Sequence, residues 1–189
     1  MKALCLAATL VAALGSTSAA AQDAWKNDVF AGYSMLVVGG SGCEDCENDA
    51  VGENTFHGWN AALGWGLSRR LDLVLDVSGH SGQDLIGDDV DVLSVMAGPR
   101  FVFGGGRLRP FLHVIGGVVR SSAGINIFEV NITESATDLG GAAGGGLDIG
   151  FGDRWALRLA GDYRAVKTDA DTATDPRFSA GVVYRFGTR

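Results

Sequence analysis

Hydrophobic and polar residues alternate one by one along most of the chain, which is the period-two pattern of β-strands with two contrasting faces. In the clearest segment, residues 155–164, Trp155 and Leu157 lie on one phase, and Arg158 and Asp162 lie on the other. The same pattern predicts eight strands, over residues 28–38, 55–67, 71–79, 90–103, 108–120, 138–149, 155–164 and 178–186. Eight such segments in succession predict an all-β fold in which one face of the sheet is apolar throughout.

The connections between these strands alternate in length. Three are tight, namely 68–70, 104–107 and 150–154, and four are long and polar, namely 39–54, 81–89, 121–137 and 165–175. Short turns at one end and long loops at the other are typical of an antiparallel up-and-down transmembrane β-barrel. We therefore predict eight antiparallel strands closed into a barrel, with both chain termini at the end that bears the short turns.

The apolar phase can face lipid, or it can face inward around a ligand in a soluble periplasmic barrel of lipocalin type, which has the same periodicity. A water-facing surface usually mixes lysine and glutamate freely. Only Lys26 and Lys167 remain beyond residue 21, and the glutamates all fall in the predicted loops: Glu44, Glu47, Glu53, Glu129 and Glu134. The polar phase of the strands is rich in small residues, which suits the narrow bore of a small barrel. The composition therefore favours lipid on the apolar phase and leaves the soluble ligand-binding barrel as an alternative.

The first 21 residues have the three parts of a secretory signal peptide. Lys2 precedes the apolar stretch 3–14, and small residues lead to Ala21, after which we expect cleavage. The mature domain, residues 22–189, then carries 14 basic and 22 acidic residues, a formal net charge of −8. This charge disfavours nucleic acid as a partner. The export signal, together with the predicted transmembrane barrel, predicts a location in the outer membrane of a Gram-negative bacterium.

Several charged residues fall on the phase that would line the bore: Asp72, Asp76, Arg100, Asp148, Arg158, Asp162 and Arg185. A charge enclosed away from water must be paired, because an unpaired one costs several kcal/mol. We expect an ion-pair network that plugs the bore, so that it conducts ions poorly. The alternative is that charges near strand ends, Asp72 and Arg185 among them, are solvated.

Aromatic residues gather at the strand ends beside the short turns: Trp25, Trp65, Phe101, Phe103, Trp155, Tyr184 and Phe186. Amphipathic rings favour the level of the lipid headgroups, so this set predicts an interfacial girdle. Ordinary strand propensity is the alternative explanation.

Three stretches, SVMAGPRFVFGGGRLRPFLHVIGGV, GGGLDIGFGDRWALRLAGDYR and RFSAGVVYRFG, resemble the small eight-stranded outer-membrane β-barrel family, the OmpA-like and opacity-like transmembrane domains. The resemblance covers nearly the whole mature chain and implies an integral outer-membrane barrel with a structural or surface-interaction role. It also implies that Tyr184 and Phe186 form the C-terminal signal for the barrel-assembly machinery, although three residues follow Phe186 where the family often ends. No peptidoglycan-binding domain follows the barrel, so no cell-wall tether is implied.

The resemblance leaves an enzymatic alternative open, because some eight-stranded barrels modify lipid A. The candidate general bases are His57, His80 and His113, and the candidate nucleophiles are Ser78, Ser81 and Ser94. We expect instead that His113 is a hydrogen-bonded interior residue, that His80 is solvated beside a loop, and that the protein is not an enzyme.

Cys43 and Cys46 form a C-x-x-C pair in the first long loop. In an exported chain with no other mature cysteine, a disulfide that staples the loop is the leading interpretation, with two free thiols as an alternative. The acid-rich loop segments 44–49, 84–91 and 169–175 are interpreted as solvated, and no cofactor or metal is expected. The expected partners are outer-membrane lipids and lipopolysaccharide, with periplasmic chaperones during assembly, and we expect a monomer.

Overall fold

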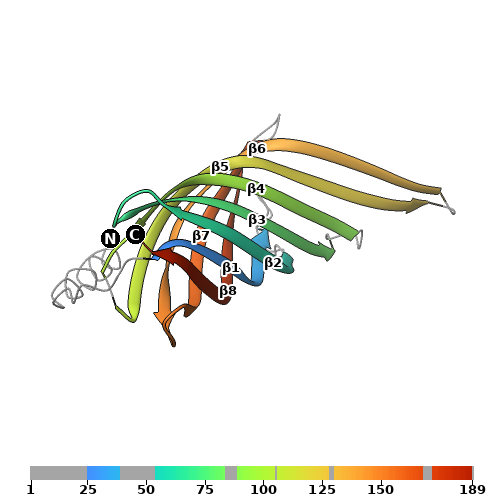
Figure 1. Ribbon diagram of the computed structural model, residues 1–189. Coiled ribbons are helices and arrows are strands. Elements are labelled where there is room, and N and C mark those ends of the chain that lie inside the picture. Colours follow the sequence, from blue (N-terminus) through green and yellow to red (C-terminus); the bar gives the residue numbers. More distant parts are fainter. Residues whose placement is uncertain are drawn as a thin grey trace, which may run out of the picture.

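The computed structural model describes residues 25–38, 54–83, 89–104, 106–127, 130–167 and 172–188 of the chain. These residues form a closed barrel of antiparallel strands in which each strand pairs with its neighbours in sequence and β1 pairs with β8 (Figure 1). The strands are β1 (Trp25–Val38), β2 (Asn54–Gly66), β3 (Leu71–Gln83), β4 (Asp89–Val102), β5 (Leu108–Ile127), β6 (Val130–Gly150), β7 (Trp155–Lys167) and β8 (Thr172–Thr188). The predicted eight-stranded up-and-down architecture is confirmed. Within the described ranges, no helix is long and apolar enough to cross a membrane.

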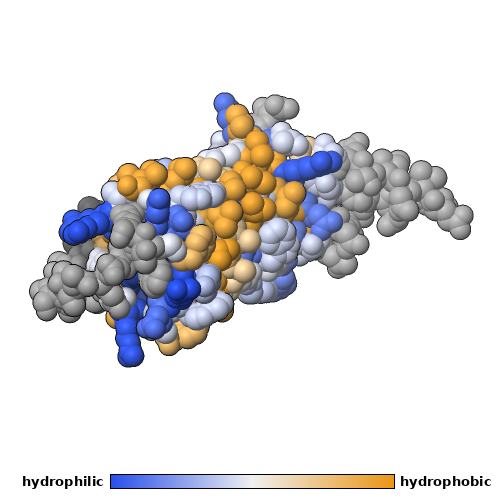
Figure 2. Space-filling view, in the orientation of Figure 1, coloured by the Kyte–Doolittle hydropathy of each residue, from blue (hydrophilic) through white to orange (hydrophobic). Residues whose placement is uncertain are grey.

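The two faces of each strand differ as the alternation predicts, with the large apolar residues on the outside. On β7, burial alternates almost residue by residue, so that Leu157 and Leu159 are exposed while Arg158 and Asp162 are buried. Figure 2 shows the resulting apolar surface on the visible barrel wall, with strongly hydrophilic residues near the end that carries the short turns. A soluble barrel would place these faces the other way round, so the burial pattern contradicts that alternative.

The hairpin of β5 and β6 is longer than the neighbouring strands, and here the predicted loop 121–137 is wrong. β5 continues to Ile127 and β6 begins at Val130, whereas β4 starts at Asp89 and β7 stops at Lys167. β5 is paired with β4 as far as Gly124, so β5 passes β4 by three residues, whereas β6 extends nine residues past its last pair with β7, Leu139 with Lys167 (Figure 1). The polar residues of this segment suggested a loop, but they alternate with β-branched residues that favour strands.

The opposite end is closed by three tight turns, which the sequence predicted in place and length. In the turn between β4 and β5, Gly104 and Gly106 have φ angles of 78° and 87°. This left-handed conformation is readily available only to glycine. Trp25 at the start of β1 pairs with Thr188 at the end of β8, so these strand ends lie at the same end as the turns.

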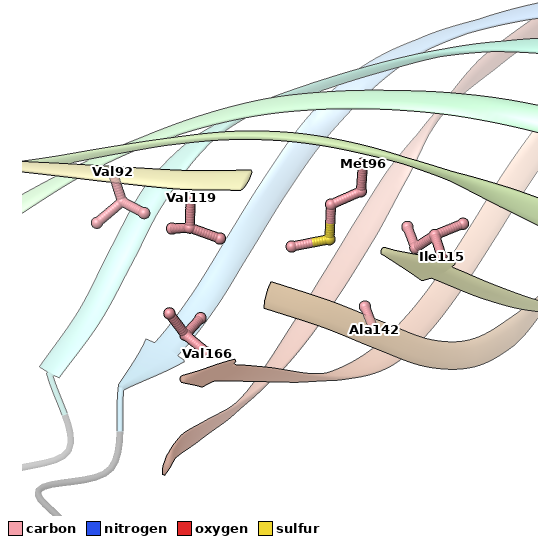
Figure 3. Close-up of a cluster of buried hydrophobic side chains, with 6 residues drawn as sticks. All are labelled: Val92, Met96, Ile115, Val119, Ala142 and Val166. Carbon is pink, nitrogen blue, oxygen red and sulfur yellow. The ribbon is translucent and has the colours of Figure 1, made fainter. Parts of the chain in front are cut away.

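The interior of the barrel contains two apolar clusters that occupy different depths. Phe30, Ala62, Val74, Ala156 and Val183 lie toward the turns. The second cluster lines the β4–β7 wall toward the long loops (Figure 3) and is called the loop-side apolar cluster below: Val92, Met96, Ile115, Val119, Ala142 and Val166. The rest of the described interior holds polar and charged side chains together with single apolar ones, Leu36, Phe56, Val102 and Phe111.

Candidate functional site

Six charged side chains form one connected chain across the bore near the turns. We call this set the turn-side cluster: Asp28, Asp72, Arg100, Asp148, Arg158 and Arg185. They come from six different strands, β1, β3, β4, β6, β7 and β8, because each strand points one inward residue at this depth. Three acids and three bases meet there, so the cluster is formally neutral.

Arg100 and Arg158 hold the turn-side cluster together. Arg100 donates to Asp28, and its Nη2 atom lies 2.9 Å from Oδ2 of Asp72. Arg158 is bidentate to Asp148, with Nε to Oδ1 at 2.7 Å and Nη2 to Oδ2 at 3.0 Å, and its Nη2 lies 3.5 Å from Oδ1 of Asp28. Arg185 completes the chain with Nη2 donating to Oδ2 of Asp148 at 3.1 Å. Such charge-assisted pairs are the strong ones when they are enclosed.

Aromatic rings and a glycine surround the two central arginines of this cluster. The guanidinium carbon of Arg158 lies 5.4 Å from the ring centre of Phe30 and 4.9 Å from that of Phe111. These are cation–π distances. Gly64 makes the space beside Arg100, because a Cβ atom on this glycine would lie 2.6 Å from Arg100 Nη2. A glycine on the polar phase of β2 thus serves the packing of a charged pair.

A second group of polar residues, the midbore cluster, centres on Arg177. Its Nε and Nη2 donate to the two oxygens of Asp162 at 3.0 and 3.1 Å, and its Nη1 donates to Asp76 at 2.8 Å and to Ser78 at 3.0 Å. Asn60 donates to Asp76 at 2.9 Å. Arg177 therefore bridges β8 to both β3 and β7 across the interior.

A cavity of about 20 Å³ separates the two clusters. Arg100 and Phe111 line it from one side, and Asp76, Asp162 and Arg177 line it from the other. This volume is enough for about one water molecule. Two layers of ion pairs thus cross the described bore with only this small cavity between them.

Among the described residues, polar contacts become sparse toward the long loops. Nε2 of His80 lies 2.9 Å from Oγ of Ser34, and Arg164 makes one contact of 3.6 Å with Asp175. Nδ1 of His80, Nε and Nη1 of Arg164 and Oδ1 of Asp175 are buried without a hydrogen-bond partner among the described residues. The loop-side apolar cluster fills the other wall at this depth.

The structure places all seven predicted interior charges in the bore. It brings five of them into the turn-side cluster and the other two, Asp76 and Asp162, into the midbore cluster. Asp72 and Arg185, for which solvation was the alternative, are both buried.

Four charged residues of the interior were missed by the sequence reasoning: Asp28, Arg164, Asp175 and Arg177. Arg177 was missed because the last strand was predicted to begin one residue later, although it shares the phase of Ser179 and Arg185. The prediction that Asp175 lies in a solvated loop is wrong, because β8 begins at Thr172 and this carboxylate is only 4% exposed.

The prediction that His80 is solvated is also wrong, since it is 2% exposed. β3 continues to Gln83, so His80 still lies on the inward phase. The hydrogen bond of His80 is to Ser34, which was not among the candidate nucleophiles, and both are enclosed.

The remaining catalytic candidates are not assembled into one site. His113 is buried with its ring against Phe111, and Ser78 shares a hydrogen bond with Ser94 at 2.7 Å. His57 and Ser81 lie opposite each other in the β2–β3 ladder, and Nδ1 of His57 is hydrogen-bonded to the hydroxyl of Tyr33. Cys43 and Cys46 lie outside the described residues, so their disulfide stays a prediction.

Two aromatic bands flank the apolar wall. The predicted band beside the turns is exposed at Trp65, Phe101, Phe103, Trp155 and Phe186, Tyr184 is half-buried against Trp155, and the side chain of Trp25 lies outside the described part. A second band near the long loops was not predicted: Tyr33, Trp59, Tyr163 and Phe178. Aromatic girdles at both interfaces are the pattern of an outer-membrane barrel.

Comparisons with known proteins agree with this geometry. A family model, the outer membrane protein beta-barrel domain, matches residues 7–186. No curated protein sequence matches the chain.

Three solved structures share the fold at low sequence identity. Neisserial surface protein A has a TM-score of 0.67 at 15% identity, covering 85% of this chain and 97% of its own. The attachment invasion locus protein Ail of Yersinia pestis has a TM-score of 0.58 at 20% identity, covering 86% and 99%. The outer membrane protein OprG of Pseudomonas aeruginosa has a TM-score of 0.54 at 12% identity, covering 88% and 98%.

Proposed function

Because the chain belongs to the outer membrane protein β-barrel family, we propose that it is a closed scaffold that presents its long-loop end at the cell surface. In this proposal its role is structural or surface-binding, and it catalyses no reaction. The barrel anchors the loops in the membrane, and the loops contact molecules outside the cell.

The observation that carries the proposal is the filled bore inside an apolar outer wall. The turn-side cluster joins six of the eight strands, and Arg177 ties β8 to β3 and β7 again at the next depth. A barrel whose interior is occupied by its own side chains is suited to mechanical support and poorly suited to transport.

The charge of the loop end narrows the kind of partner that fits. Besides the buried Asp175, the segments 39–54, 81–89, 121–137 and 165–175 together hold twelve acidic residues and a single lysine. Ail of Yersinia pestis has been crystallised in complex with the heparin analogue sucrose octasulfate, a polyanion. The acidic segments here would repel such a ligand, so we propose a neutral or cationic surface partner instead.

Epitope insertion tests the topology of this scaffold. A short tag is placed in the β5–β6 connection, between residues 128 and 129, and a matched tag is placed in the β6–β7 turn at residue 152. Antibody should label intact cells with the first tag only, and both tags after the outer membrane is permeabilised. Labelling of the turn tag on intact cells would contradict the proposal.

Planar-bilayer recording tests the closure of the bore. The purified barrel should give no stable conductance steps, because the two layers of ion pairs obstruct the path of a hydrated ion. Regular open steps in the wild-type protein would show that the bore is a channel and would overturn the scaffold proposal.

A further inference from the structure

Basic side chains surround the end of the barrel that bears the short turns. We call this set the basic rim: Lys26, Arg69, Arg70, Arg107 and Arg154. All five are exposed, and they are spread over the start of β1 and all three tight turns. Asp153 is the one exposed acid among the described residues of this end. The rim is thus cationic although the whole chain is acidic.

The buried acids at the same end of the barrel are paired with arginines of the interior. These acids, Asp28, Asp72 and Asp148, are hydrogen-bonded to Arg100, Arg158 and Arg185 of the turn-side cluster. The rim charges therefore face outward, away from a cluster that is already neutral.

Large apolar residues are exposed in the same turns, which sets the depth of the rim in a membrane. Leu67 is 65% exposed and Phe151 is 64% exposed, and Phe103 and Leu108 flank the β4–β5 turn in the same way. Such side chains are stable at the boundary between acyl chains and headgroups, and long basic side chains beside them extend toward the phosphates. Each turn therefore combines apolar side chains suited to the acyl chains with basic side chains suited to the phosphates.

The β6–β7 turn shows this arrangement in most detail. Nη1 of Arg154 donates to the hydroxyl of Tyr184 at 3.2 Å, and the ring of Tyr184 lies 4.8 Å from that of Trp155. A guanidinium held beside two interfacial rings is placed at headgroup level with donors suited to phosphate oxygens.

The β2–β3 turn is held by its own serine. The backbone N–H groups of Arg70 and Leu71 donate to Oγ of Ser68 at 3.4 and 3.1 Å. This bonding defines the turn, so that Arg69 and Arg70 are presented side by side at the rim.

From this geometry we propose that the basic rim binds the phosphodiester headgroups of anionic phospholipids in the leaflet that faces the short turns. The proposal rests on insertion in a bilayer and is independent of the surface role proposed above. The long segments that connect the strands at the opposite end hold twelve acids in the sequence besides the buried Asp175. An anionic leaflet should therefore attract the turn end more strongly than the loop end, which adds to the orientation of the barrel.

Native mass spectrometry of the purified barrel tests this inference. The protein is presented with equal amounts of phosphatidylglycerol and phosphatidylcholine, and the lipids that remain bound after detergent removal are counted. The test variant is R69Q/R107Q, and the matched control is R120Q/K167Q, which removes two exposed positive charges near the other end. Heat-modifiable migration in gels checks that each variant is folded.

The wild type should prefer phosphatidylglycerol, with a preference that weakens as salt is raised. The R69Q/R107Q variant should lose on the order of 10- to 30-fold of this preference, at about fivefold per charge, and the control should keep it. Equal retention of both lipids by the wild type would overturn the proposal even if the variant failed to fold. An equal loss in the control would show that the basic rim is not the binding site. Displacement of the lipid by millimolar inorganic phosphate would show that the rim binds free phosphate and not a lipid headgroup.

Discussion

The two halves of the bore are filled by different kinds of contact, ion pairs near the turns and apolar packing near the loops. In the turn-side half, Arg100 and Arg158 each contact two carboxylates, so opposite charges alternate without a break. In the loop-side half, Arg164 and Asp175 share a single contact of 3.6 Å and leave three buried polar atoms without partners among the described residues, against one, Nε of Arg185, in the turn-side cluster. The loop-side apolar cluster supplies most of the packing there.

The difference shows that burial of a charge is not by itself a measure of stabilisation. Removing one member of a connected network leaves a buried charge without a partner, which lowers stability strongly. In a poorly paired couple, the attraction barely offsets the desolvation cost, so the pair adds little to stability. We therefore expect the turn-side half to be sensitive to substitution and the loop-side half to tolerate changes in its charged pair.

The largest effect should come from Arg158→Ala. This change removes the bidentate contact with Asp148, the contact with Asp28 and the packing against two phenylalanine rings. The free energy of unfolding should fall by about 3 to 5 kcal/mol, measured by urea titration in lipid vesicles. Arg120→Ala, at an exposed position, should change it by about 0.5 kcal/mol or less. Similar values for the two variants would contradict the network.

A smaller loss is expected from Met96→Ala in the loop-side apolar cluster. Met96 is 1% exposed and packs in the bore of the barrel. Truncation leaves a cavity that should cost about 2 to 4 kcal/mol, while Met96→Leu should cost under about 1.5 kcal/mol because it nearly conserves volume. Equal costs in the same urea titration would show that this cluster is loosely packed.

Gly64→Ala tests the space that the turn-side cluster requires. The new Cβ would lie 2.6 Å from Arg100 Nη2, and the displacement of the guanidinium should cost about 1 to 3 kcal/mol. Gly152→Ala is the control, because a Cβ atom there has no neighbour within 4 Å. A neutral Gly64→Ala would mean that Arg100 moves aside freely.

The smallest effect is expected from the double variant R164L/D175L. Removing both partners of the weak pair should leave stability unchanged or raise it slightly, by about 0 to 2 kcal/mol. The matched double variant R158L/D148L should still be destabilised, because Arg185 and Asp28 each lose a partner. If both double variants lose equal stability, the two halves of the bore do not differ as described.

The fold was predictable because alternation is a local signal. Neighbouring residues such as Leu157 and Arg158 lie on opposite faces of a strand whatever its position in the sheet. The alternation of short and long connections then predicts which strands are neighbours. The end of a strand is a weaker signal, because polar residues occur both in loops and on the inward face of a barrel. Arg177 and Asp175 were missed for this reason.

The partners of the charged residues could not be predicted from the sequence. The phase of the alternation places Arg100 and Arg158 inside, but their contacts with Asp28 depend on the register between strands and on the stagger of the closed barrel. Asp28 lies about 70 residues from Arg100 and about 130 residues from Arg158 in sequence. Only the closed sheet brings these residues to the same depth.

The central claim is that lipid contacts the apolar outer face, and depth-dependent fluorescence quenching tests it most directly. Trp59 and Trp65 lie on the outward phase of β2, one in each aromatic band, and Leu63→Trp places a third probe between them. In variants that keep one tryptophan each, lipids brominated near the headgroup should quench positions 59 and 65 most strongly. Lipids brominated deep in the acyl chain should quench position 63 most strongly. Efficient quenching of all three positions by aqueous iodide, with none by brominated lipid, would contradict the account.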